Sequence, residues 1–260
     1  MKLNQLKVTI IQSHLHWENP VTNRILFSEK IKGISEETHL IILPEMFTTG
    51  FTMNAEQLAE EPEGPSLRWM QGVAKDKGCA ITGSVIVKEN DFYFNRLYFV
   101  FPDSTYKKYD KKHTFTLARE HKTFKAGEER IIIEYRDWKI CPLICYDLRF
   151  PVWARNTVNY DVLIYAANWP KKRISAWDAL LKARAIENMS YCIGVNRVGL
   201  DGNGFEYIGH TAVYDVLGER ISTSKFEQEF IETITLSKEH VVSNRNHLQF
   251  LEDKDDFTLA

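Results

Sequence analysis

The sequence of 260 residues has little net charge, no long apolar run and no secretory leader pattern. A formal net charge of -2 disfavours nucleic acid or an anionic membrane as the main partner. No apolar run approaches the roughly 20 residues needed to cross a bilayer, and the N-terminus lacks the apolar region and cleavage site of a signal peptide. These absences predict a cytoplasmic protein that binds neither nucleic acid nor membrane.

Cysteine is also scarce, since the chain has four: Cys79, Cys141, Cys145 and Cys192. They lie within or beside apolar runs, and their spacing matches neither a disulfide scaffold nor a zinc site. The sequence therefore predicts free thiols in a reducing compartment and no metal site. One of the four can be catalytic while the other three pack in the core.

With 44% hydrophobic and 26% charged residues, the composition is that of a globular protein with a sizeable core. Strand-length apolar runs alternate with helical segments, which predicts a layered α/β fold with a mixed sheet arrangement. No linker or repeat divides residues 1–260, so we expect a single domain. The predicted helices cover about 20–33, 65–77, 151–156 and 174–188, and the predicted strands cover 8–11, 39–43, 79–87, 92–101, 105–109, 131–135, 139–144, 161–166, 191–196, 210–215, 218–224 and 230–234.

Cys145 follows directly on the apolar run 140–144, where a buried strand is predicted to end and a polar segment can begin a helix. A side chain at such an elbow projects into a cleft, and the new helix directs its free backbone N–H groups to the same place. That environment suits a nucleophilic thiol and a developing oxyanion. The alternative is an inert buried cysteine, which is common in protein cores.

Two further ionisable residues follow predicted strands. Glu45 comes after four aliphatic residues and a proline, where partial desolvation would make its carboxylate a better base. Lys111 lies just past the strand 105–109 and could stabilise an oxyanion. Each residue taken alone is more often a solvated surface charge. Together with Cys145 they place three reactive groups at strand ends, where layered α/β proteins form their sites.

The three segments that carry these residues are Leu43-Pro44-Glu45, Tyr109-Asp110-Lys111-Lys112-His113 and Cys145-Tyr146-Asp147-Leu148-Arg149-Phe150-Pro151. In order and spacing they resemble the motifs of the nitrilase (carbon–nitrogen hydrolase) superfamily, and the resemblance spans nearly the whole chain. It implies a four-layer α-β-β-α sandwich whose subunits pair into αββααββα homodimers.

Three more segments, at 167–170, 181–188 and 196–204, look like the ω-amidase branch of that superfamily. The branch hydrolyses the terminal amide of 2-oxo-dicarboxylic acid monoamides, such as 2-oxoglutaramate and 2-oxosuccinamate, to the acid and ammonia. The resemblance therefore implies a small-molecule amide as substrate and a reaction that needs no metal or organic cofactor.

The resemblance also implies residue roles. Glu45 would be the general base, and Cys145 would be the nucleophile that forms a thioester. Lys111 and the backbone N–H of Tyr146 would hold the oxyanion. Glu120 matches the second glutamate that orients the lysine in this family, against the alternative of a surface charge.

A substrate carboxylate must meet a cation, and the planar fork of arginine suits it best. Arg173, in a loop just past the strand 161–166, is the predicted partner, although loop arginines are commonly plain surface charges. Arg149 is expected to form a structural ion pair. His113 is expected to be a structural hydrogen-bonding group, because Glu45 already fills the role of base.

The aromatic residues Phe47, Phe115 and Trp169 either line the pocket or belong to the core. Other reactions remain open for the same three groups, namely nitrile or carbamoyl hydrolysis. Two other classes also compete: a non-catalytic nitrilase-like binding protein, and a redox thiol protein in which Cys141 resolves Cys145.

Overall fold

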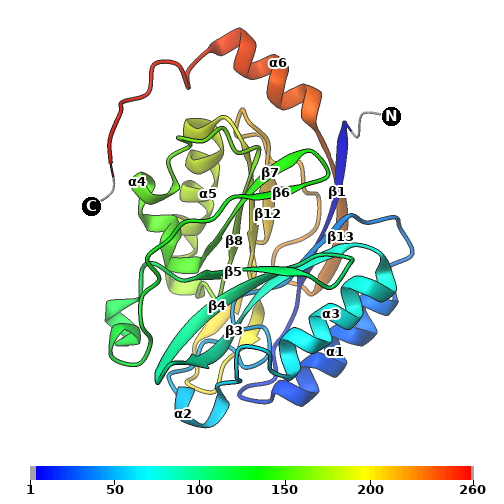
Figure 1. The fold of residues 1–260 in the computed structure, drawn as a ribbon, viewed down its shortest axis with the longest axis vertical. Helices are drawn as coiled ribbons and strands as arrows, with labels where there is room; N and C mark the ends of the chain where they lie inside the picture. Colours follow the sequence, from blue (N-terminus) through cyan, green and yellow to red (C-terminus); the bar gives the residue numbers. More distant parts are fainter. Residues whose placement is uncertain (1–3, 259–260) are drawn as a thin grey trace.

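The computed structural model describes residues 4–258, and its framework is two β-sheets packed face to face (Figure 1). The first sheet has the strand order β13-β1-β2-β3-β4-β5. The β1–β2 and β2–β3 pairs are parallel and the other pairs are antiparallel. Its strands are β1 (Gln5–Gln12), β2 (Leu40–Ile42), β3 (Ala80–Glu89), β4 (Phe92–Val100), β5 (Tyr106–Asp110) and β13 (Phe230–Ser237).

The second sheet has the order β12-β9-β8-β7-β6, with a parallel centre and antiparallel edges. Its strands are β6 (Ile133–Tyr135), β7 (Trp138–Ile144), β8 (Val162–Ala166), β9 (Tyr191–Val195) and β12 (Ala212–Tyr214). A separate antiparallel hairpin is formed by β10 (Val198–Leu200) and β11 (Glu206–Ile208).

Helices cover the outer faces of both sheets (Figure 1). The first sheet is covered by α1 (Pro20–Lys32) and α3 (Pro65–Lys77), and the second by α4 (Pro151–Ala154) and α5 (Ile174–Asn188). The start of α1 was readable in the sequence: Asn19 Oδ1 accepts the N–H of Thr22 at 3.1 Å, and Pro20 occupies the first turn. Two helices were not predicted, the short α2 (Ala55–Leu58) and the C-terminal α6 (Lys238–Leu248).

Side chains alternate between the two faces of each strand, and this alternation builds the layers. In β7, Ile140 belongs to the cluster between the sheets that also contains Ile10 of β1 and Ile164 of β8. Cys141 and Leu143 point the other way, into the cluster that contains α5. The predicted α-β-β-α sandwich is confirmed. No helix within residues 4–258 is long and apolar enough to cross a membrane.

One predicted strand is wrong. Residues 218–224 form no strand and pair only through an isolated bridge between Tyr214 and Arg220. The backbone N–H groups of Thr223 and Ser224 instead donate to the carboxylate of Glu232. A side chain thus takes the hydrogen bonds that a strand ladder would have used.

Candidate active site

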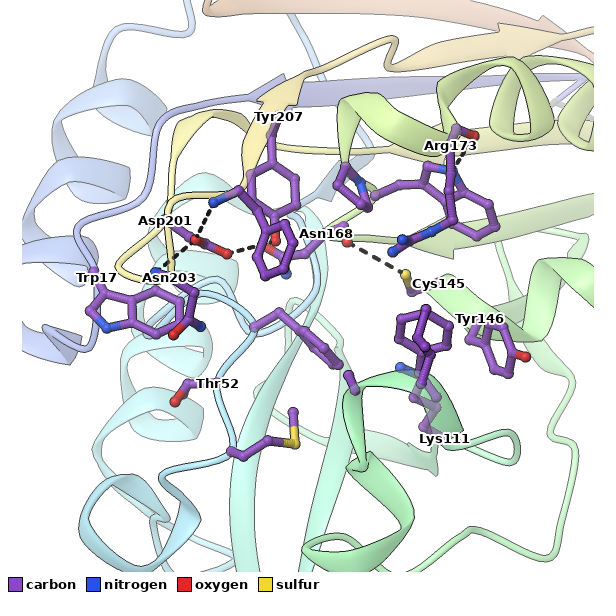
Figure 2. Close-up of a pocket in the computed structure, with 18 of the residues that line it drawn as sticks. Trp17, Thr52, Lys111, Cys145, Tyr146, Asn168, Arg173, Asp201, Asn203 and Tyr207 are labelled. Carbon is purple, nitrogen blue, oxygen red and sulfur yellow. Dashed lines mark hydrogen bonds between the residues drawn. The ribbon is translucent and has the colours of Figure 1, made fainter.

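Strand ends from both sheets meet at a cavity of about 500 Å³. Its walls include Lys111 after β5, Cys145 after β7, and the segment after β8 that carries Trp169 and Arg173. Figure 2 shows the side chains of Lys111, Cys145 and Arg173 directed into this common space. The structure therefore joins residues that are far apart in sequence.

Cys145 lies at a strained elbow. Its backbone φ is +42°, in the left-handed region that non-glycine residues rarely adopt. Such strain concentrates at functional sites. The sulfur lies 3.9 Å from the carbonyl oxygen of Asn168, and only 9% of the residue is exposed (Figure 2). The helix expected after Cys145 is present as a 3₁₀ helix, η3 (Cys145–Arg149), whose first N–H groups, including that of Tyr146, have no partner within the helix.

Glu45 is completely buried, so the alternative of a solvated charge is wrong. Its Oε1 accepts bonds from Lys111 Nζ and from Asn95 Nδ2, both at 2.8 Å. Its Oε2 accepts the backbone N–H of Asn168 at 2.9 Å. The carboxylate is therefore held on both oxygens, by groups from three other parts of the chain.

Lys111 bridges two carboxylates. Besides Glu45, its Nζ lies 2.9 and 3.0 Å from the two oxygens of Glu120, which is itself fully buried. Burial lowers the pKa of Lys111, but the charges of Glu120 and Glu45 outweigh it and hold that pKa above its ordinary value. Burial raises the pKa of Glu120, Lys111 opposes the rise, and Glu45 adds to it. The lysine is thus a fixed, buried cation.

The Cys145 thiol is neutral at rest. Burial raises its pKa well above the ordinary value of 9.0, and the negative charge of Glu45 raises it further, while Lys111 opposes the shift. A thiol of this kind can act as a nucleophile only if a neighbouring base takes its proton as it attacks. The same burial raises the pKa of Cys141 to about 12. A thiol so reluctant to ionise is a poor resolving cysteine, and all four cysteines are free.

The predicted pocket residues Arg173, Phe115 and Trp169 all line the cavity. The guanidinium of Arg173 lies over the Phe115 ring, 4.9 Å from its centroid, and Trp169 Nε1 donates to the backbone oxygen of Arg173 at 2.8 Å. Phe47 belongs to the core beneath α1 and α3 instead. Arg173 pairs with no carboxylate within residues 4–258, which leaves its charge available to a ligand.

The expectation for Arg149 is wrong. It forms no ion pair among the described residues, and its guanidinium lies 4.8 Å from the ring centroid of Trp169, at the cavity wall. The expectation for His113 is confirmed, since its ring nitrogen bonds Asp147 at 2.8 Å. Sequence reasoning missed Asn168 as a site residue, although it stood in a segment singled out for its resemblance. Nothing in the sequence marked Asn95 as a site residue, because its place in β4 looks like an ordinary strand position.

The family model described as Carbon-nitrogen hydrolase matches residues 7–244. The chain belongs to the carbon–nitrogen hydrolase family. A relative in Escherichia coli, omega-amidase YafV, is 42% identical over 98% of this carbon–nitrogen hydrolase and 98% of its own length. A 2-oxoglutaramate amidase of Bacillus subtilis is 32% identical over 86% of this chain and 88% of its own.

Solved structures agree with this membership. A crystal structure of a CN-hydrolase superfamily protein from Xanthomonas campestris, with an arsenic adduct in its active site, has a TM-score of 0.96 to this chain. The two are 39% identical, over 98% of this chain and 99% of the other. The fold of this carbon–nitrogen hydrolase is therefore that of its family throughout.

Proposed function

We propose that this carbon–nitrogen hydrolase is an ω-amidase, which cleaves the terminal amide of 2-oxo-dicarboxylic acid monoamides such as 2-oxoglutaramate and 2-oxosuccinamate. The observation that carries the proposal is the position of Arg173, which pairs with no carboxylate of the described residues, in the same cavity as the Cys145 thiol. A substrate with an amide at one end and a carboxylate at the other matches those two groups. The relatives named omega-amidase and 2-oxoglutaramate amidase support the same substrate class.

In the first half-reaction, the sulfur of Cys145 attacks the amide carbon while Glu45 takes the thiol proton. The carbonyl oxygen becomes an oxyanion, which the Lys111 ammonium and the backbone N–H of Tyr146 stabilise. Protonated Glu45 then gives its proton to the departing nitrogen. The C–N bond breaks, ammonia leaves and a thioester on Cys145 remains.

In the second half-reaction, Glu45 accepts a proton from water as the water oxygen attacks the thioester carbon. The same donors hold the second oxyanion. The C–S bond then breaks, the thiol recovers its proton, and the free acid leaves. Substrate, water and these side chains supply every atom and proton of both steps.

Ammonia release tests the proposal. The wild type and Cys145→Ala are each assayed with 2-oxoglutaramate, with glutamine, asparagine, a carbamoyl amino acid and a simple nitrile as comparison substrates. We expect fast release from 2-oxoglutaramate by the wild type alone. If the wild type prefers a nitrile or a carbamoyl compound, the substrate assignment fails and the Glu–Lys–Cys chemistry stands. If no compound is turned over, a binding role replaces the enzymatic one.

The proposal extends to assembly and location. We infer a single-domain subunit that forms a homodimer in the cytoplasm, as the resemblance to the superfamily suggests. Light scattering coupled to size exclusion gives the subunit number directly, and a monomer at micromolar concentration would contradict the dimer.

A further inference from the structure

Asp147 is a fully buried carboxylate two residues past the proposed nucleophile, and the mechanism above gives it no part. Four donors surround it. Its Oδ1 accepts the backbone N–H of His113 at 3.0 Å and bonds the Nδ1 atom of the same residue at 2.8 Å. Its Oδ2 accepts the backbone N–H of Ile144 at 3.0 Å and the hydroxyl of Tyr109 at 2.7 Å.

These donors come from two segments on different sheets. Tyr109 lies in β5 of the first sheet, and His113 follows that strand by three positions. Ile144 ends β7 of the second sheet. Lys111 lies between Tyr109 and His113, while Cys145 lies between Ile144 and Asp147 itself. The carboxylate therefore ties the segment that carries the ammonium to the segment that carries the thiol.

The link that Asp147 makes between these two segments, called the tie below, has rigid surroundings. The His113 ring stacks on Phe150 with centroids 3.7 Å apart and planes 6° apart. The hydroxyl of Tyr109 also accepts the indole N–H of Trp153 at 3.1 Å and the backbone N–H of Lys112 at 3.2 Å. The His113 ring and the Tyr109 hydroxyl are thus each held from a second side.

We propose that Asp147 is a positioning residue that sets the distance between the Lys111 ammonium and the N-terminal turn of η3. Both oxyanion donors must reach the same oxygen atom, and one donor comes from each of the two segments. A shift of about 1 Å in such an arrangement can reduce the rate about 10²-fold. The tie rests on geometry alone, whereas its effect on turnover rests on the proposed amidase function.

The substitution Asp147→Asn tests the tie because no orientation of an amide can replace the carboxylate. The backbone N–H of His113 faces one oxygen and the backbone N–H of Ile144 faces the other. An asparagine presents its oxygen to one of them and its NH₂ group to the other. The NH₂ group then faces a backbone N–H, and two donors cannot bond each other. The segment that carries this N–H must therefore move.

A matched control is Asp215→Asn. Asp215 is also a buried carboxylate, and its Oδ1 accepts two backbone N–H groups, from Leu217 and Glu219, each at 2.9 Å. Its Oδ2 bonds the ring of His240 at 2.9 Å. Here one oxygen serves both backbone donors, so an asparagine keeps them. Asp215 does not line the cavity.

Two measurements follow on both variants. For Asp147→Asn we expect kcat to fall about 10²-fold with KM within about threefold of the wild type, since the loss is confined to the transition state. We also expect faster amide hydrogen exchange in peptides covering 111–115 and 144–149. The strands of the two sheets should exchange at the wild-type rate. Asp215→Asn should match the wild type in both. Exchange at the wild-type rate in these two peptides, or a loss of protection shared equally by the whole chain, overturns the proposal.

A second variant covers the case in which Asp147→Asn does not fold. His113→Phe keeps the stacking on Phe150 and the backbone donor but removes the ring nitrogen bond. We expect a roughly tenfold fall in kcat with the same local exchange signature; a wild-type kcat and exchange pattern would contradict the tie. If the wild type hydrolyses no amide, the proposed function fails, while the exchange measurement still decides whether Asp147 joins the two segments.

Discussion

The ammonium nitrogen of Lys111 lies 2.8 Å from Oε1 of Glu45, with both side chains almost fully removed from solvent. The proposed base therefore begins the reaction inside an ion pair. Its other oxygen, Oε2, accepts only the backbone N–H of Asn168 among the described residues. Oε2 therefore keeps a lone pair that can accept the thiol proton. Glu45 can take that proton on this oxygen, while the Lys111 ammonium, on the other side of the ion pair, stabilises the oxyanion.

The first prediction concerns the base. Glu45→Gln keeps the size of the side chain and an acceptor for Lys111 but removes the proton acceptor. We expect kcat to fall by about 10²–10⁴, while iodoacetamide still alkylates Cys145, because loss of the Glu45 charge makes the thiolate easier to form. Ammonia release and mass spectrometry measure the two. A kcat near that of the wild type would exclude Glu45 as the base.

The second prediction concerns stability. Lys111→Met leaves the carboxylates of Glu45 and Glu120 buried without their shared cation. Breaking a buried ion pair from one side costs about 3–5 kcal/mol, so the urea midpoint should fall markedly. The control is Lys108→Met, since Lys108 is 46% exposed and pairs with Glu89 at the surface. That exposed pair contributes at most about 1 kcal/mol, and equal losses in the two variants would contradict the buried-cation interpretation.

The third prediction concerns substrate recognition. If Arg173 binds the substrate carboxylate, Arg173→Met should raise KM for 2-oxoglutaramate about 10- to 100-fold, the effect of one charged hydrogen-bonding group. KM for a neutral amide should change little. Arg173→Lys should not restore the affinity, because an ammonium cannot form the planar fork.

Arg149→Met serves as the comparison for that measurement. The Arg149 guanidinium stacks on Trp169 at the same cavity wall. If the substrate carboxylate binds Arg173 alone, the KM of Arg149→Met for 2-oxoglutaramate should equal that of the wild type. A larger effect at Arg149 than at Arg173 would reverse the assignment between the two arginines.

The apolar runs predicted a layered α/β fold with a mixed sheet arrangement, whereas only the resemblance to the nitrilase superfamily implied the four-layer sandwich. The proximity of Glu45, Lys111 and Cys145 was anticipated because their motifs follow predicted strand ends. The contact of Glu120 with Lys111 was implied by the resemblance alone. That Glu45 bonds the same ammonium could not be read from the sequence, since residues far apart in sequence meet only after both sheets close. The four bonds to Asp147 were hidden for the same reason.

Other failures have local causes. In α6 only Val241 is buried, so the helix carries no apolar stripe that a pattern could reveal. Its start depends on Ser237, whose side chain accepts the N–H of His240 at 3.2 Å. The sequence predicted a helix after Cys145 but not its type, which is 3₁₀; there the Oδ2 atom of Asp147 accepts the N–H of Ile144.

The last prediction concerns alkaline stability. Burial raises the pKa of Cys79 from 9.0 to about 11, with Lys77 opposing the shift. Below pH 9 the thiol is protonated in both the folded and the unfolded chain, so it contributes nothing to the pH dependence. As pH rises above 9 the unfolded chain loses this proton first, and stability falls until pH passes about 11.

Cys79→Ala removes this contribution to the pH dependence. The variant is less stable near neutral pH because of the cavity left behind, but its stability should fall by about 1 kcal/mol less than that of the wild type between about pH 8 and pH 10. Urea unfolding at the two pH values measures the difference. Ala74→Gly, a small change at another buried position without a titrating group, should retain the wild-type pH dependence. Parallel stability curves for the wild type and Cys79→Ala would show that the Cys79 thiol ionises equally in both states.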